Sequence, residues 1–129
     1  MALQDELLAR MEKDLAALLA SARGLIQRRQ FAEASKVLGD GYRQLFGLDR
    51  RFLQMMKPED VAQLLAKPQK ILGFARMMAE EADLLRLQHD TESASATARW
   101  AVKILEAGKQ TGEATLLARL RTMADLLGP

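Results

Sequence analysis

Apolar residues recur every three or four positions along most of the chain, which is the period of amphipathic helices. The first such run extends from about Leu3 to Arg29, and the second from about Phe31 to Phe46. Two more run from about Pro68 to Gln88 and from about Thr91 to Ala107. β-branched residues are scarce and alternating apolar and polar runs are absent. The pattern therefore predicts an all-α fold.

Turn and capping residues divide these runs and predict shorter helices between and after them. Gly47 can end the second helix, because glycine adopts the left-handed conformation without a side-chain clash. Asp49 can cap a short helix, and Pro58 suits the first position of another. Thr111 is the predicted cap of the last helix.

A set of small residues occurs twice, with an offset of 60 positions. In each copy the first small residue lies late in one helix and the other two lie in the next helix. Small side chains at these places allow two antiparallel helices to approach closely. Gly39 has no counterpart in the second copy, and the pattern does not account for it. The two sets are Ala22, Ala34 and Gly41, and Ala82, Ala94 and Ala101.

This arrangement resembles the tetratricopeptide repeat family, whose units carry small residues at the same places in helices A and B. The stretch Phe31–Ala34 is similar to the aromatic-x-Glu-Ala turn into helix B of that family. Regular units of the family follow one another every 34 residues, whereas these are offset by 60. The chain also resembles small bacterial proteins of no assigned activity that pair two such units around a Phe-Gly-Leu helix end, matched by Phe46–Leu48.

The resemblance implies two antiparallel helix hairpins of tetratricopeptide type within a single helical-repeat domain, 1–129. The expected units are residues 8–47 and 68–108. Short helices in 48–67 bridge them, and a C-terminal capping helix spans 112–127. Stacking of the hairpins supplies the core that one hairpin alone could not bury.

Composition narrows the possible functions. Hydrophobic residues make up 49% of the chain and the net charge is +2, which is typical of a folded soluble protein. Cysteine is absent, which excludes disulfides and thiolate chemistry. The start of the chain lacks the basic and apolar blocks of a signal peptide, and no run reaches the 20 or so apolar residues of a membrane span. We expect a cytoplasmic protein without a membrane partner.

Candidate chemistry is sparse. The lone His89 has no partner at metal-ligand spacing, so we expect an exposed turn residue. The acidic run Glu80, Glu81 and Asp83 lies within one helix and favours a solvated face. Tyr42 and Trp100 are expected to be buried or half-buried, although either could anchor a partner. The sequence therefore predicts no catalytic, cofactor-binding or metal-binding residues, no cofactor and no enzymatic activity.

We expect a protein-interaction module of unknown specific role that binds a peptide or partner helix. The resemblance implies that helix-A positions line the binding surface. Two alternatives stay open. One is a homo-oligomeric structural protein, such as a homodimer, indicated by heptad-like spacing from Leu8 to Leu25. The other, ranked lower, is a nucleic-acid binder using the basic region 23–57, which has eight basic and three acidic residues. For the interaction module, the contact residues that the resemblance implies on the helix-A surface are Arg23, Gln27, Arg76, Asp83 and Arg86.

Overall fold

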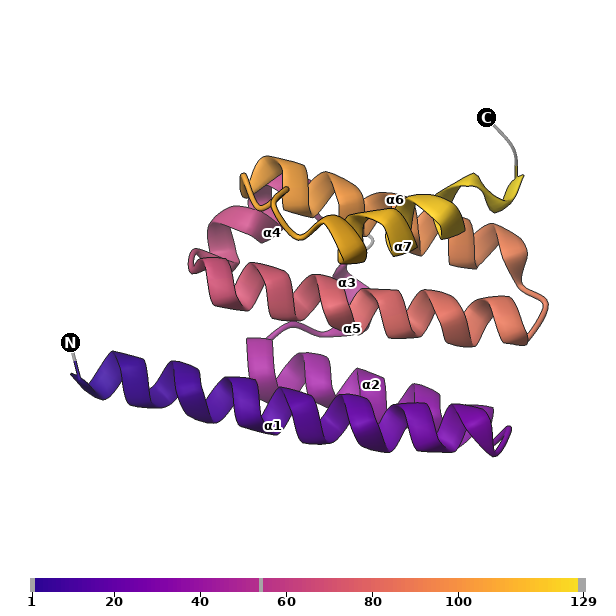
Figure 1. The fold of residues 1–129 in the computed structure, drawn as a ribbon, viewed down its shortest axis with the longest axis horizontal. Coiled ribbons are helices and arrows are strands. Elements are labelled where there is room, and N and C mark those ends of the chain that lie inside the picture. Colours follow the sequence, from indigo (N-terminus) through magenta and orange to yellow (C-terminus); the bar gives the residue numbers. More distant parts are fainter. Residues whose placement is uncertain (1, 54, 128–129) are drawn as a thin grey trace.

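The computed structural model describes residues 2–53 and 55–127 (Figure 1). Within these ranges the chain forms seven α-helices and a short 3₁₀ helix, with no strand, which confirms the all-α prediction. The helices are α1 (Ala2–Gln27), α2 (Phe31–Phe46), α3 (Arg50–Leu53), α4 (Pro58–Leu65), α5 (Pro68–Leu87), α6 (Thr91–Ala107) and α7 (Ala114–Ala124), and η1 (Asp125–Leu127) follows α7.

Antiparallel pairs organise the helices. The pair α1–α2 packs against α5, which itself pairs with α6 (Figure 1). On the other side, α7 packs against both α6 and α5. The short helix α4 packs mainly against α6, and α3 lies near α2. The prediction of antiparallel helix pairs is confirmed. Helix α5 lies between the α1–α2 pair on one side and α6 with α7 on the other.

The two long hairpins turn in the same way. Arg29 and His89, 60 residues apart, both adopt the left-handed conformation, with φ of 60° and 65°. After each of them a backbone amide donates to the carbonyl five residues earlier, which is the Schellman arrangement of a helix end. The offset that relates the small residues therefore also relates the turns. The two backbone hydrogen bonds that close the turns run from Gln30 N to Leu25 O at 2.8 Å and from Asp90 N to Leu85 O at 2.9 Å.

The repeated small residues lie in the core, since all five alanines have no exposed surface and Gly41 is buried. Gly41 shows why size matters at these places. A Cβ atom there would lie 2.5 Å from Leu18 Cδ1 and 2.8 Å from Met77 Cε. Helices α1, α2 and α5 meet closely at this glycine, and even a methyl group would require its neighbours to move.

Three of the predicted helix boundaries are confirmed and one is wrong. Gly47 ends α2 with φ of 67°, Asp49 accepts a hydrogen bond from the Arg51 amide at 2.9 Å, and Pro58 is the first residue of α4. The last helix begins at Ala114 instead of near Thr111. A helix capped by Thr111 would have had to begin with Gly112, and glycine is a poor helix former.

Candidate functional site

The predicted contact residues occupy the outer sides of α1 and α5. Arg23, Gln27, Arg76 and Arg86 are exposed, and Asp83 is half-buried. The structure brings Arg23, Asp83 and Arg86 into one charged cluster. Arg76 lies apart from it, where its guanidinium is 3.9 Å from the carboxylate of Glu113.

Five charged residues of α1, α5 and α7 form a connected network of ion pairs. Glu80 pairs with both Arg23 and Arg119, the latter at 3.2 Å. Arg119 also pairs with Asp83 at 2.5 Å, and Arg86 pairs with Asp83 at 3.3 Å. Three arginines therefore face two carboxylates, which leaves one net positive charge. The arginine side chains keep from a third to a half of their surface exposed.

The expectation of a solvated acidic face was wrong for Glu80 and Glu81. Their side chains are only 7% and 13% exposed. The error has a physical cause, because their partners lie far away along the chain. Periodicity describes the contacts within a helix and gives no sign of Arg119, which contacts Glu80 from α7. Asp83 pairs with Arg86, three residues later in the same helix.

Glu81 points to a different side of α5 from Glu80 and joins a second charged group. Its carboxylate lies 2.6 Å from a guanidinium nitrogen of Arg50. It also accepts a hydrogen bond of 3.2 Å from the hydroxyl of Tyr42, which is fully buried. Burial raises the pKa of Glu81, and the Arg50 charge and the Tyr42 hydrogen bond partly oppose this rise.

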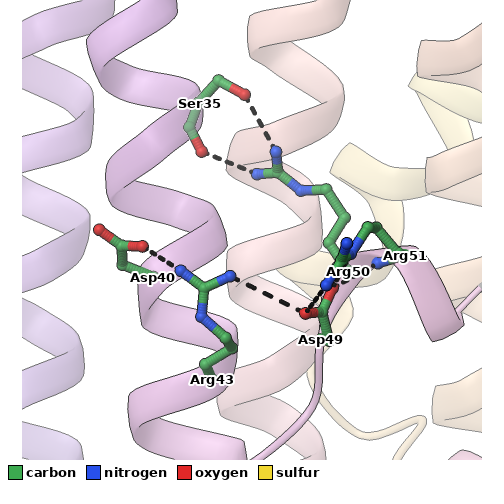
Figure 2. A network of polar contacts seen from close by, with 6 residues as sticks. All are labelled: Ser35, Asp40, Arg43, Asp49, Arg50 and Arg51. Carbon is green, nitrogen blue, oxygen red and sulfur yellow. Dashed lines mark hydrogen bonds and ion pairs between the residues drawn. The ribbon is translucent and has the colours of Figure 1, made fainter.

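Arg50 connects the bridging segment to helix α2. Its guanidinium donates to the Ser35 hydroxyl at 3.0 Å and to the Ser35 carbonyl at 2.9 Å, as Figure 2 shows. Its central carbon also lies 5.7 Å from the centre of the Tyr42 ring. The Arg50 Nε atom is buried and has no hydrogen-bond partner among the described residues. The side chain is thus tightly held although one donor is unsatisfied.

Arg50 and Glu81 form the polar part of a cleft of about 290 Å³ between α3, α5 and α6. Each helix contributes residues that its period places on one side, such as Met78 and Glu81 of α5, three positions apart. The half-buried Trp100 of α6 forms an aromatic wall. The cleft therefore offers an apolar surface beside a partly buried ion pair. Its other lining residues are Leu53, Ala96 and Thr97.

Internal ion pairs also occupy the basic region 23–57. At least four of its eight basic residues contact a carboxylate within the chain. Arg43 lies between Asp40 and Asp49, and Arg51 pairs with Asp49 at 3.1 Å (Figure 2). The hydrogen bonds from Arg51 lower the pKa of Asp49. Much of the charge that the sequence suggests for binding is therefore balanced inside the fold.

The remaining sequence-predicted features lie outside these clusters. His89 is exposed in its turn, as expected, and Tyr42 is buried while Trp100 is half-buried. Across residues 2–53 and 55–127, no three His, Cys, Asp or Glu side chains gather closely enough to hold a metal ion. Over the same residues, no helix has the length and apolar character needed to cross a membrane.

The sequence carries only a weak signal for the cleft. Its walls come from three segments, and the four-residue α3 is too short to show a helical period. Comparison with other proteins does not add an assignment. No known protein family, no curated protein and no solved structure matches the chain.

Proposed function

We propose that the protein is a non-enzymatic interaction module that captures a segment of a partner protein in the cleft beside Trp100. The observation that carries this proposal is the placement of Trp100 and Arg50 in the walls of one cleft. Tryptophan and arginine are the residues that most often dominate binding energy at protein interfaces. Met78 adds an adaptable apolar side chain to the same walls.

The architecture proposed with this function is a pair of tetratricopeptide-like units, α1–α2 and α5–α6. Support comes from the common offset of 60 residues, which relates the buried small residues and the Schellman turns at Arg29 and His89. A third turn of this kind follows α6 at Lys109, so the small residues carry most of the support. Helix α7 packs on the second pair, as expected for a capping helix. The bridging segment that separates the units supplies Arg50 and Leu53 to the cleft. In this proposal the unusual spacing between the units is what creates the binding site.

The size and chemistry of the cleft define the segment it accepts. A volume of about 290 Å³ is near the lower limit of small-molecule pockets and suits one or two bulky apolar side chains. Arg50 and Glu81 balance each other, so the cleft carries no strong net charge. The expected occupant is a partner helix or peptide that inserts leucine, methionine or phenylalanine next to Trp100. A polar group beside that anchor would contact Thr97 or the ion pair.

Peptide selection tests this proposal without knowledge of the natural partner. Short random peptides displayed on phage are selected on the full chain, and binding is measured through the fluorescence of Trp100, the single tryptophan. We expect enrichment of peptides with one bulky apolar anchor, and loss of their binding in Ala96→Arg, because Ala96 is an exposed residue of the cleft wall. Ala17→Arg, an exposed alanine of α1 outside the cleft, is the matched control. Binding that survives Ala96→Arg would exclude the cleft.

A second candidate surface is the network of α1, α5 and α7 that includes the predicted contact residues. Its excess of one arginine favours a partner segment with acidic side chains. The double variant Arg23→Glu plus Arg86→Glu reverses this excess and would abolish such binding. Selected peptides, or a specific partner recovered from cell extract, that are lost in this variant and retained in Ala96→Arg would place the binding site on the network.

The alternative that the basic region 23–57 binds nucleic acid stays a prediction. It requires the basic region to contact phosphates through residues that are partly engaged in internal ion pairs. Such binding would weaken steeply with salt, because phosphate contacts release condensed counterions. Absence of DNA and RNA binding at low ionic strength would remove this alternative.

A further inference from the structure

The first half of α1 carries an apolar stripe that continues past the surface against which the helix packs. Leu3, Leu7, Met11 and Leu15 lie four residues apart and therefore on one side of the helix. Met11 and Leu15 are buried, whereas Leu7 is 55% and Leu3 is 68% exposed. Figure 1 shows the same geometry, since the start of α1 extends beyond the end of α2. The stripe that builds the core thus reaches solvent at its N-terminal end.

A groove of about 330 Å³ lies along this exposed end of the stripe. Its apolar wall includes Leu8, Met11 and Leu45, and its polar wall is formed by Lys67 and Lys70. No ion pair to either lysine is found within residues 2–53 and 55–127. An occupant that complements both walls would combine apolar side chains with carboxylates.

The first half of α1 itself has this chemistry. Asp5 and Glu12 are both exposed and lie two helical turns apart, on the edge of the stripe next to Leu8. Leu3 and Leu7 provide the apolar side chains beside them. Within one molecule this segment forms a wall of the groove and cannot also fill it. A second molecule can supply it.

We propose that two copies of the chain form a symmetric dimer in which the start of α1 of each copy lies in the groove of the other. Asp5 and Glu12 of one copy face Lys67 and Lys70 of its partner. A two-fold axis makes this contact twice, because the same patch is used by both subunits. This dimer is independent of the Trp100 cleft, so failure of either proposal leaves the other intact.

Sedimentation analysis of the full chain over a wide concentration range provides the first test. The average mass is expected to rise from 14.4 kDa toward twice that value. Leu7→Glu places a charge in the stripe and should raise the dimer dissociation constant at least about tenfold, which corresponds to a loss of about 1.4 kcal/mol. The matched control is Leu64→Glu on α4, where the leucine is similarly exposed at 59%. A monomer at every concentration, or equal effects of the two variants, would overturn the proposal.

Charge exchange tests which surfaces meet. The variants Lys67→Glu plus Lys70→Glu, and Asp5→Lys plus Glu12→Lys, should each be monomeric alone because like charges would meet at both contacts. An equimolar mixture of the two variants should form a heterodimer, since one contact is then reversed in sign and the other is native. Circular dichroism of each variant establishes that it is folded. Failure of folded variants to associate when mixed would contradict the paired contacts.

Discussion

Gly39 and Gly41 lie two residues apart in α2 and make different contacts, so their replacement by alanine separates helix propensity from packing. A Cβ atom at Gly39 would lie 3.6 Å from Arg50 Cζ, which is ordinary van der Waals contact. A Cβ atom at Gly41 would lie 2.5 Å from Leu18 Cδ1 and 2.8 Å from Met77 Cε. Both substitutions remove a glycine from the interior of the same helix.

The expected magnitudes follow from these distances. Replacing glycine by alanine inside a helix stabilises by about 1 kcal/mol. Gly39→Ala should retain most of this gain. Gly41→Ala has the same gain, but it must displace two side-chain ends, and overpacking of this kind costs about 1–3 kcal/mol. Because the displaced atoms end side chains that can rotate, we take about 1–2 kcal/mol. Gly39→Ala should therefore be more stable than Gly41→Ala by about 1–2 kcal/mol.

Urea unfolding followed by circular dichroism measures both variants against the parent chain. For a chain of this size the difference corresponds to roughly 4–8 °C in Tm, so calorimetry offers an independent check. The propensity contribution cancels in the comparison, and the remainder reports packing at Gly41. Equal stabilities, or a more stable Gly41→Ala variant, would refute the close approach of α1, α2 and α5.

Three further predictions concern ionisation and backbone strain. Burial raises the pKa of Glu81 in the folded chain above the ordinary glutamate pKa of 4.5. The stability that protonated Glu81 provides is therefore fully present below pH 4.5, and it is lost as the pH rises through the folded-state pKa. The unfolding free energy of the parent chain relative to Glu81→Gln should therefore fall as the pH rises above 4.5, and a constant difference would contradict this. Burial, followed by the Glu81 charge, raises the pKa of Tyr42 well above 10.0, so the tyrosinate absorbance of this single tyrosine should appear only with alkaline unfolding. Tyrosinate in a chain that retains its helical signal would show that Tyr42 is accessible. His89 adopts a left-handed backbone conformation, which glycine takes without strain. His89→Gly should therefore stabilise the fold by about 0.5–1 kcal/mol in urea unfolding, because the strain removed outweighs the extra freedom of glycine in the unfolded chain. Gly47→Ala puts a side chain at φ of 67° and should destabilise the fold in the same assay.

Periodicity and small residues were sufficient to predict the helices and their antiparallel pairing. The pairing was predictable because Ala22 and Ala82 mark places where helices approach closely, and such places require small side chains whatever else surrounds them. The repeat pattern does not explain Gly39, because the contact of this residue lies outside the pattern. Its neighbour is the Arg50 guanidinium, which reaches α2 from the bridging segment. A contact between a glycine and a long side chain from elsewhere leaves no periodic signal.

The charged clusters were the part that the sequence concealed. Glu80 and Glu81 appear as consecutive polar residues, which usually indicate a surface, but each is covered by a different set of helices. Only the three-dimensional packing places Arg119 against Glu80 and Arg50 against Glu81. The cleft depends on the same information, because α3 contributes Arg50 through a four-residue helix whose position is set by tertiary contacts.

The central position of α5 has a consequence for how the molecule unfolds. Contacts such as Leu15 with Gly73, and Met77 with the region of Gly41, join the first hairpin to the second. Repeat proteins with separable units can unfold stepwise from their ends. In this chain α5 of the second hairpin also packs against both helices of the first, so we expect the two hairpins to unfold together. Amide hydrogens around Phe74 should therefore exchange only on global unfolding, while those at the start of α1 exchange through local fraying.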